Sequence, residues 1–385
     1  MTPSLETKLP RVGTTIFSVM SQLALEHNAV NLGQGFPDFA PPARLTQALT
    51  RAMADGHNQY PPGIGLPALR EQIAHKTERL YGRATDAATE VTVTSGATEA
   101  IFAAIAAVVR AGDEVLVLDP AYDCYEPAID LQNATAVRVP LTLPDFAVDW
   151  QRVRDAITAR TRLIIVNSPH NPTGAVFSAA DLDALADALR DTSVWVLADE
   201  VYEHMVFDGA AHQSVARHAE LAERSFIVSS FGKTYHCTGW KVGYCIAPPA
   251  LTAEFRKVHQ YLTFATFGPA QWAFADMLAA EPEHYLQLPA FYQHKRDAFR
   301  AMLAETPLTR LDVPGGYFQL VDYSAVRDVD DVTFCQWLVR EAGVAAVPLS
   351  PFFETPPDTR LLRLCFAKND ATLTAGVERL AQLRA

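Results

Sequence analysis

Short apolar runs recur along the middle of the chain, and longer stretches with helical spacing lie between most of them. Helical spacing is clear, for example, over residues 180–190. The apolar runs, each expected to be a strand, lie at 90–94, 114–118, 136–139, 163–166, 194–197 and 226–228. Strands that alternate with helices are typical of a mostly parallel sheet covered by helices on both faces. The pattern therefore predicts an α/β protein.

The two ends of the chain carry further elements. Before the alternating region we expect helices, broken by Gly/Pro turns, at 14–28, 43–54 and 66–81. Residues 252–280 have the pattern of long helical material that leads into a second, smaller unit. In that unit the pattern predicts two helices and two strands, at 285–305, 315–321, 331–341 and 361–366. A chain of 385 residues is expected to form one large domain or two unequal ones.

Composition narrows the possible functions. The formal net charge of −12, with no basic run, argues against a general nucleic-acid binder. The sequence lacks an uninterrupted apolar stretch of about 18 residues and a secretory signal, so we expect a cytoplasmic protein with no membrane span. The five cysteines are scattered without metal-binding spacing, so we expect reduced thiols and no metal site.

Lys233 follows the apolar run at 226–228 and is surrounded by small residues. Such a lysine is partly desolvated, which lowers the pKa of its amine and makes it a usable nucleophile toward a carbonyl. Ser230 and Lys241, on either side, can hydrogen-bond or neutralise a phosphate. The simpler alternative is a surface lysine in a Gly-containing turn, since lysine is rarely buried.

Asp199 follows the apolar run at 194–197 and the next residue, Ala198. A carboxylate that emerges from a buried strand needs a partner. A protonated pyridine nitrogen would supply one, and the pair would keep the ring an electron sink. Tyr202, three residues on, can donate a hydrogen bond to a ring oxygen. An ordinary N-cap aspartate is the alternative.

Two turns at strand ends can bind anions. The segment 95–98 lies between a strand and a helix, where free N–H groups, a hydroxyl and Gly96 form an anion cradle, although Ser/Thr helix caps are common. Asn167 and Asn171, four residues apart, can hold a phenolate oxygen and a substrate carboxylate together. A tight loop rich in asparagine and proline is the other interpretation.

Tyr122 and Arg363 complete the candidate residues. Tyr122 lies just after Asp119 and Pro120, where it can stack on a flat ring, although a half-buried loop tyrosine is equally typical. Arg363 is a cation inside an apolar strand and is costly there unless it is paired. A substrate carboxylate is a natural partner for its fork of N–H donors. A structural ion pair with an internal Asp or Glu is the rival.

The order of these features along the chain resembles that of one protein family. It is similar to pyridoxal-phosphate (PLP) dependent class I/II aminotransferases of fold type I, over essentially the whole chain. The similarity is greatest with the branch that contains bacterial methionine aminotransferase and kynurenine–oxoglutarate aminotransferase. The segments that carry it are 31–39, 58–60, 123–127, 171–174, 199–204 and 230–243.

The resemblance implies a fold and a division into domains. A large domain over 46–285 would hold a mostly parallel seven-stranded sheet between helices. A smaller α+β domain would combine 1–45 with 286–385. Family members form homodimers whose active sites are completed across the interface, so we expect the same here.

The resemblance also implies roles for single residues in binding the cofactor. Lys233 would be the Schiff-base lysine and proton shuttle, and Asp199 would hold the pyridine nitrogen. Asn171 and Tyr202 would contact the ring oxygen, and Tyr122 would stack on the ring where relatives often have phenylalanine. The phosphate would be held by Gly96, Ala97, Ser230 and Lys241, with Tyr60 reaching over from the other subunit.

For the substrate, the resemblance implies two groups of contacts. The α-carboxylate would be bound by Arg363 and Asn171, with Gly35 and Asn167. The side-chain pocket would be formed by Phe17, Gly35, Tyr60, Tyr125 and segment 264–267 of the partner.

The implied reaction exchanges an amino group between an amino acid and a 2-oxo acid by ping-pong kinetics. Methionine and aromatic amino acids are the expected donors, and pocket contacts separate apolar side chains by only about 1–3 kcal/mol. The alternatives are a kynurenine aminotransferase or a cysteine-S-conjugate β-lyase with the same site. A regulator with an aminotransferase-like sensor would need a DNA-binding module before Asn31, and we expect none.

Overall fold

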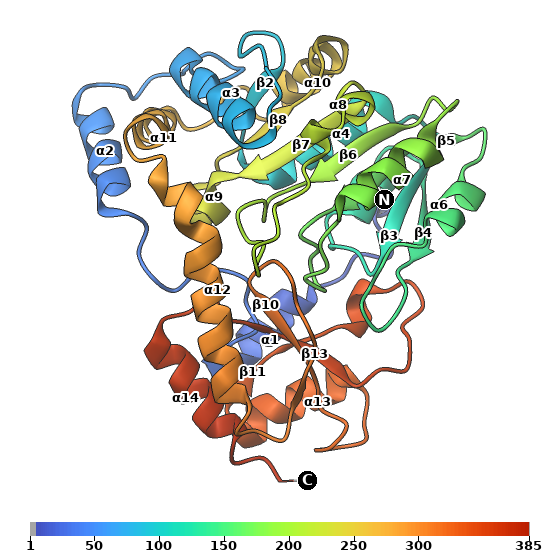
Figure 1. The fold of residues 1–385 in the computed structure, drawn as a ribbon, viewed down its shortest axis with the longest axis vertical. Coiled ribbons are helices and arrows are strands. Elements are labelled where there is room, and N and C mark those ends of the chain that lie inside the picture. The colour runs from blue at the N-terminus through green and yellow to red at the C-terminus, as the bar shows by residue number, and fades with distance from the viewer. Residues whose placement is uncertain (1–4, 385) are drawn as a thin grey trace, which may run out of the picture.

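A seven-stranded sheet forms the centre of the larger part of the molecule. The computed structural model describes residues 5–384, and Figure 1 shows the sheet in its upper half. The strand order is β2-β8-β7-β6-β5-β3-β4, and β8 alone runs antiparallel to its neighbours. The strands are β2 Val91–Thr94, β3 Glu114–Asp119, β4 Thr135–Pro140, β5 Thr161–Asn167, β6 Trp195–Asp199, β7 Ser225–Ser230 and β8 Gly243–Ile246. The α/β class and the mostly parallel seven-stranded sheet are confirmed.

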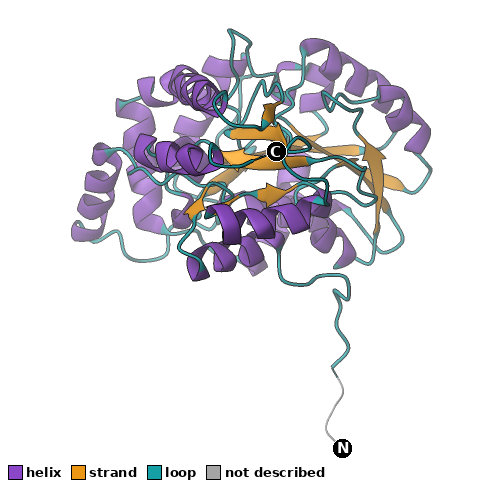
Figure 2. Ribbon diagram, turned by 90° about the horizontal axis from the view of Figure 1, so that it is seen from below, coloured by secondary structure: helices purple, strands orange, loops and turns teal. Residues whose placement is uncertain are grey.

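Helices cover both faces of this sheet because its strands are apolar on both sides. In β3, Val115 and Val117 pack toward α4, α5 and α10, while Leu116 and Leu118 point to the opposite face, as the strand period of two requires. Figure 2 shows helices on either side of the strands. The helices of this part are α2 Ala43–Ala54, α3 Pro67–Tyr81, α4 Gly96–Val108, α5 Tyr125–Asp130, α6 Trp150–Ala156, α7 Ala179–Leu189, α8 Ala219–Ala222, α9 Phe231–Thr234, α10 Pro249–Leu262 and α11 Gly268–Ala280.

A smaller unit lies below the large sheet in Figure 1, and the long helix α12 (Glu283–Leu303) runs between the two. Its antiparallel sheet has the order β12-β13-β10-β9. The N-terminal segment joins this unit because β1 (Val30–Asn31) pairs with β11 (Val344–Ala345). The remaining elements are α1 Ile16–Glu26, β9 Thr309–Arg310, β10 Phe318–Asp322, α13 Asp331–Trp337, β12 Val347–Pro348, β13 Leu361–Cys365 and α14 Asp370–Leu380. The residue limits of the two domains stay a prediction.

The structure differs from the sequence pattern in several places. The pattern missed β8, a four-residue strand that begins at a glycine inside the lysine segment. The helical stretch 252–280 is two helices, and the chain turns between them where Phe264 has a φ of +66°. The helix predicted over 331–341 ends at Trp337 and continues as a short π-helix over Leu338–Ala342.

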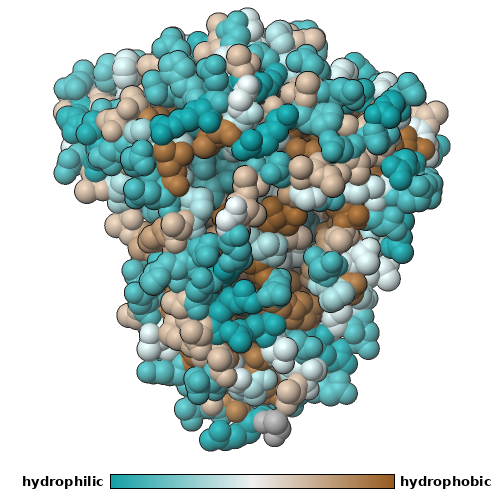
Figure 3. Space-filling view, viewed as in Figure 1, coloured by the Kyte–Doolittle hydropathy of each residue, from teal (hydrophilic) through white to brown (hydrophobic). Residues whose placement is uncertain are grey.

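The carboxyl ends of β3, β5, β6 and β7 meet at the edge of the large sheet that faces the smaller unit. Asn167 lies opposite Asp199 in register, and Asp199 lies opposite Val228. Ligands of open α/β sheets bind beyond such strand ends. Figure 3 shows apolar side chains reaching the surface at the waist between the two units. Within residues 5–384, no helix has the length and apolar character that crossing a membrane requires.

Candidate active site

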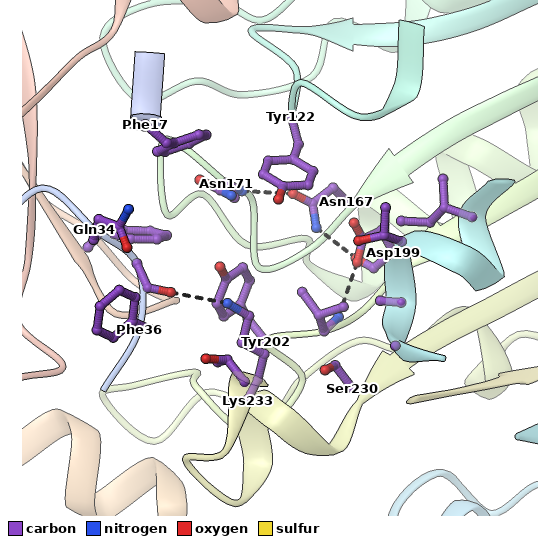
Figure 4. Close-up of a pocket in the computed structure, with 18 of the residues that line it drawn as sticks. Phe17, Gln34, Phe36, Tyr122, Asn167, Asn171, Asp199, Tyr202, Ser230 and Lys233 are labelled. Atoms are coloured by element: carbon purple, nitrogen blue, oxygen red, sulfur yellow. Dashed lines mark hydrogen bonds between the residues drawn. The ribbon is translucent and has the colours of Figure 1, made fainter. Parts of the chain in front are cut away.

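A cavity of about 310 Å³ lies between the carboxyl edge of the large sheet and the smaller unit. Figure 4 shows its labelled side chains converging from separate elements. The lining residues come from both units and are Phe17, Gln34, Gly35, Phe36, Gly96, Ala97, Thr98, Ile101, Tyr122, Asn167, Asn171, Asp199, Val201, Tyr202, Ser230, Lys233, Thr238, Lys241, Phe318 and Arg363. The structure thus brings together most of the residues that the sequence singled out.

Lys233 lies in the short helix α9, directly after β7, and its side chain reaches toward the smaller unit. Its Nζ donates to the carbonyl oxygen of Gly35 at 3.2 Å and to the hydroxyl of Tyr317 at 2.7 Å. Burial lowers the pKa of the amine from its ordinary value to about 8. At neutral pH a usable fraction of the amine is therefore unprotonated, as a nucleophile or general base requires.

Asp199 is the last residue of β6 and its side chain is buried. The hydroxyl of Tyr125 donates to Oδ2 at 2.6 Å, and the backbone N–H of Val201 donates to Oδ1 at 3.3 Å. Burial raises the pKa of the carboxyl to about 6, although the hydrogen bond from Tyr125 acts in the opposite direction. A cation placed beside this carboxylate would keep it ionised.

Asn167 and Asn171 form a connected turn at the end of β5. The side-chain amide of Asn167 donates to the carbonyl of Asp199 at 2.7 Å, and its oxygen accepts the N–H of Asn171 at 2.7 Å. Figure 4 marks both of these hydrogen bonds. The side-chain oxygen of Asn171 accepts from Nη1 of Arg363 at 2.6 Å. Asn167 therefore fixes Asn171 beside the arginine.

Arg363 lies in the middle of β13 and is only 1% exposed. Its guanidinium stacks 3.8 Å above the ring of Phe318 and lies 5.2 Å from that of Phe17. Nη2 donates to the carbonyl of Gly33 at 3.2 Å, and Nε is buried without a hydrogen-bond partner among residues 5–384. The hydrogen bonds of Arg363 go to neutral oxygens, so the rival structural ion pair is absent from the described part of the chain. A buried cation with an unused N–H fits an anion in the cavity.

The first turn of α4 forms another part of the cavity wall, where Gly96 and Ala97 offer backbone N–H groups that the helix does not use. A φ of +77° at Gly96 favours glycine, and a Cβ there would lie 3.2 Å from the Nζ of Lys241. The lysine ammonium thus lies beside the positive end of a helix, an arrangement that an anion between them would stabilise. With the hydroxyl of Ser230 on the same wall, the donor set fits a phosphate.

Two tyrosines flank the space between Lys233 and Asp199. The Nζ of Lys233 lies 5.4 Å from the ring centroid of Tyr202, which is buried. Tyr122 follows β3, and its ring centroid lies 6.5 Å from that of Phe17. Burial raises the pKa of both tyrosines, so both hydroxyls are protonated and can donate.

Two expected site residues lie away from the cavity wall. Tyr125 is 3% exposed and lies behind Asp199, where its hydroxyl binds the carboxylate. Tyr60 is 80% exposed and lies in a separate hollow with residues 265–269, its ring 5.0 Å from that of Phe264. Within one chain, Tyr60 therefore does not reach the cavity.

Sequence reasoning missed several residues of this site. Gln34, Phe36 and Phe318 line the cavity, and Tyr317 contacts the amine of Lys233. The sequence predicts only a strand at Tyr317, because an aromatic residue in an apolar run ordinarily belongs to the hydrophobic core. The pair of glycines before it, Gly315 and Gly316, was the available signal of a close backbone approach.

Known proteins similar to this chain are aminotransferases. Residues 27–380 match the family described as aminotransferase class I and II. A methionine aminotransferase of Escherichia coli strain K12 is 56% identical over 378 residues, which cover 98% of each chain. The kynurenine–oxoglutarate transaminase 1 of Rattus norvegicus is 34% identical over 97% of this chain and 96% of that protein.

Two solved structures that resemble this chain are aminotransferases as well. The Escherichia coli methionine aminotransferase superposes with a TM-score of 0.97, covering 99% of this chain and 100% of that chain. An N-succinyldiaminopimelate aminotransferase from Mycobacterium tuberculosis, 42% identical, superposes with a TM-score of 0.95 over the same shares. With nearly its whole length matched in sequence and in fold, this chain belongs to the class I and II aminotransferases and is a transaminase.

Proposed function

We propose that this transaminase binds PLP in the cavity and transfers amino groups between methionine or aromatic amino acids and 2-oxo acids. The observation that supports it most is the placement of Lys233 and Asp199 on one cavity wall, with an anion cradle and a buried arginine at its ends. Donor and acceptor would use this cavity in turn, which predicts ping-pong kinetics.

The cofactor would be held by groups whose chemistry matches its own. Its phosphate fits the N–H groups of Gly96 and Ala97 with Ser230 and Lys241. Its ring nitrogen fits Asp199, because a cation beside this carboxylate would offset the burial that raises its pKa to about 6. Two further contacts complete the set: Tyr122 offers a ring face, and Asn171 and Tyr202 offer donors for the ring oxygen.

When bound, PLP supplies an electron sink for the bond to the substrate α-carbon. The chain would supply the proton transfer: Nζ of Lys233 would accept the α-proton of the substrate and pass it to the cofactor within the same half-reaction. The pKa of about 8 suits both directions of this transfer near neutral pH. A cation that faces Asp199 favours its ionised form, and the carboxylate would in turn orient the ring and preserve its electron demand.

The substrate carboxylate would bind Arg363, with Asn171 and Gly35 beside it and Asn167 fixing the turn. The unused Nε–H of Arg363 and the stacking of its guanidinium on Phe318 leave the fork rigid and facing the cavity. Rigid donors lose little entropy on binding, which favours a planar carboxylate. This contact would place the α-carbon within reach of Lys233.

The side chain of the donor would meet an aromatic wall. Phe17, Phe36 and Phe318 line the cavity together with Tyr122 and Ile101. This wall suits the thioether of methionine and aromatic rings, since sulfur and ring contacts with aromatic faces are favourable. The methionine aminotransferase from Escherichia coli, 56% identical, supports the same choice. Kynurenine would fit the same wall, and a 34% identical relative is named for it.

The active unit would be a cytoplasmic homodimer. Aromatic side chains gather on one exposed surface, where Tyr60, Tyr261, Phe264 and Phe267 are between 48% and 90% exposed. Exposed aromatic clusters of this kind favour an interface. We propose that Tyr60 and residues 264–267 complete the cavity of the partner subunit. The five cysteines, unpaired within residues 5–384, support a reducing compartment.

Replacing the lysine tests the proposal directly. Lys233→Ala should still bind PLP but should lose the visible absorption of the lysine-bound cofactor and lose turnover by at least about a thousandfold. The wild-type protein, incubated with single amino acids, should lose that absorption fastest with methionine and aromatic donors and regain it with a 2-oxo acid. Normal turnover in Lys233→Ala would reject the proposal. Faster conversion of kynurenine than of methionine would replace the proposed donor.

A further inference from the structure

The hydroxyl of Tyr317 and the carbonyl of Gly35 form a closed hydrogen-bonded triangle with the amine of Lys233. Nζ donates to the hydroxyl at 2.7 Å and to the carbonyl at 3.2 Å. The Tyr317 hydroxyl donates its own proton to the same carbonyl oxygen. Because that proton is already used, the tyrosine oxygen can only accept from the lysine.

This arrangement decides which way the nitrogen points. A neutral lysine amine has two N–H bonds and one lone pair, and both N–H bonds are used in the triangle. The third position of the nitrogen is then directed away from the Tyr317 hydroxyl and the Gly35 carbonyl. That third position carries the lone pair in the neutral amine and the transferred proton in the ammonium.

We propose that Tyr317 and Gly35 form a holding site for the free amine of Lys233, which aims its proton-accepting position into the cavity. The holding site would act in the part of the cycle in which the lysine is not covalently attached. It rests on the proposed function, because it presumes that Lys233 both binds the cofactor and moves the substrate proton. Tyr317 is thereby a catalytic partner of the lysine that no sequence feature indicated.

The holding site is rigid because close backbone contacts fix both oxygens. Gly316, next to Tyr317, donates its N–H to the carbonyl of Met205 at 2.8 Å, and Gly315 donates to Gly174 at 3.0 Å. A Cβ at Gly315 would lie 2.6 Å from the side chain of Val176, so only glycine permits this approach. The smaller unit is thus attached to the loops that follow β5 and β6.

The other oxygen is fixed in the same way. A Cβ at Gly35 would lie 2.8 Å from the ring of Phe318, so the backbone at Gly35 is pressed against that ring. The ring of Tyr317 is 0% exposed and packs edge-on against those of Tyr202 and Phe318, at 5.1 and 4.8 Å. Neither acceptor can follow the lysine if the amine moves, so the site has a defined position.

An ordinary core tyrosine is the competing interpretation, and one matched pair of variants separates the two. Tyr317→Phe keeps the buried ring and removes only the hydroxyl. Tyr292→Phe makes the same change in another fully buried tyrosine, 6.0 Å away between ring centroids, whose hydroxyl contacts His236 and not the lysine. Equal melting temperatures of the two variants would show that any difference between them comes from the amine contact.

The first measurement uses the cofactor-free protein. The pH dependence of the rate at which an amine-modifying reagent labels Lys233, followed by mass spectrometry of its peptide, gives the pKa of the amine. An acceptor stabilises the ammonium more than the neutral amine, so its loss in Tyr317→Phe should lower the pKa by about one unit. Tyr292→Phe should titrate like the wild type.

The second measurement uses the holoenzyme and methionine carrying deuterium at the α-carbon. A loosely held amine slows proton transfer, so Tyr317→Phe should lower kcat by about tenfold, change KM little, and increase the deuterium isotope effect. A purely structural tyrosine would lower stability without increasing the isotope effect.

The outcomes distinguish this inference from the proposed function. If wild-type Lys233 holds the cofactor but Tyr317→Phe matches Tyr292→Phe in titration and isotope effect, the holding site is rejected and the proposed function stands. If wild-type Lys233 does not bind the cofactor, both fail together. A lower pKa and a larger isotope effect in Tyr317→Phe alone would confirm the holding site.

Discussion

At the scale of single residues, burial shifts the pKa values of the two central groups of the site. Burial moves the pKa of Lys233 down to about 8 and that of Asp199 up to about 6, so the two groups titrate on either side of neutral pH. Each is reached by one tyrosine hydroxyl, from Tyr317 and Tyr125 respectively. The hydrogen bond from Tyr125 lowers the pKa that burial alone would give Asp199.

Tyr125 can be tested through the pH dependence of cofactor binding. Its hydroxyl stabilises the ionised form of Asp199, so Tyr125→Phe should raise the pKa of that carboxyl above about 6, by about one unit. A protonated Asp199 cannot pair with a cationic ring nitrogen. Affinity for PLP, measured by titrating cofactor-free protein, should therefore fall about fivefold near pH 6 and approach the wild-type value above pH 8.

A matched control is available at another buried tyrosine. Tyr244→Phe removes a buried hydroxyl that contacts Glu203 and Lys76 but not Asp199. It should leave the pH dependence of PLP affinity unchanged, whatever it does to stability. An equal pH shift in both variants would show that Tyr125 acts through general packing.

The sequence predicts which residues carry the chemistry better than it predicts the side chains that surround them. Lys233, Asp199 and Arg363 stand out because charge next to an apolar run is costly. Tyr317 and Tyr125 do not stand out, since an aromatic residue in an apolar run is ordinarily core and its hydroxyl finds a partner only in three dimensions. A hydrogen bond between residues 84 positions apart, as between Lys233 and Tyr317, leaves no periodic signal in the chain.

At the scale of elements, strand periodicity predicted most strands of the large sheet and missed the shortest strands of the smaller unit. Runs such as 114–118 and 163–166 are apolar on both faces and were recognisable from the sequence. β9, β11 and β12 are two residues each, too short for a period of two to show. Their pairing depends on partners far away in the chain, as β1 with β11 illustrates.

Helix α10 connects two segments of the site through one histidine. His259 is 1% exposed; Nδ1 lies 3.0 Å from the carboxylate of Glu99, and Nε2 lies 2.8 Å from the carbonyl of Gly63. Both neighbours can only accept, so both ring nitrogens must carry protons. Glu99 in turn accepts the N–H of Ser95 at the start of α4. The imidazolium therefore fixes the phosphate turn and the loop after Tyr60.

His259→Gln should show this connection as a pH-dependent loss of stability. Burial would lower the pKa of His259, but the bonds to Glu99 and Gly63 raise it above 6.5. A group whose folded pKa is raised contributes its full stability below the unfolded pKa and loses it as pH rises through the folded value. Urea unfolding of cofactor-free protein should show the variant less stable by about 1–3 kcal/mol near pH 6, with a smaller difference near pH 9.

The control for this prediction is His75→Gln, which changes an exposed histidine of α3. It should unfold like the wild type at both pH values. A pH-independent loss in His259→Gln would mean that the histidine acts only by filling space.

At the scale of the whole molecule, one chain leaves the proposed site incomplete. Tyr60 is 80% exposed and its ring lies 5.0 Å from that of Phe264, while the cavity around Lys233 is lined by other residues. The proposed homodimer would explain both features, because two-fold symmetry would place the same loop of each chain at the other's cavity. Such a dimer would hold two cavities, each built from both chains.

Mixed dimers test this arrangement without a structure of the assembly. Tyr60→Ala and Lys233→Ala should each be nearly inactive as homodimers. If Tyr60 serves the partner's cavity, a dimer with one chain of each kind has one cavity that carries both defects and one that carries neither. Random mixing makes about half of the dimers mixed, so co-expression should restore about a quarter of the wild-type activity. Asp199→Asn mixed with Lys233→Ala should restore none, because these two residues line the cavity of one chain. Recovery in that control, or no recovery with Tyr60→Ala, would place Tyr60 outside the partner's site.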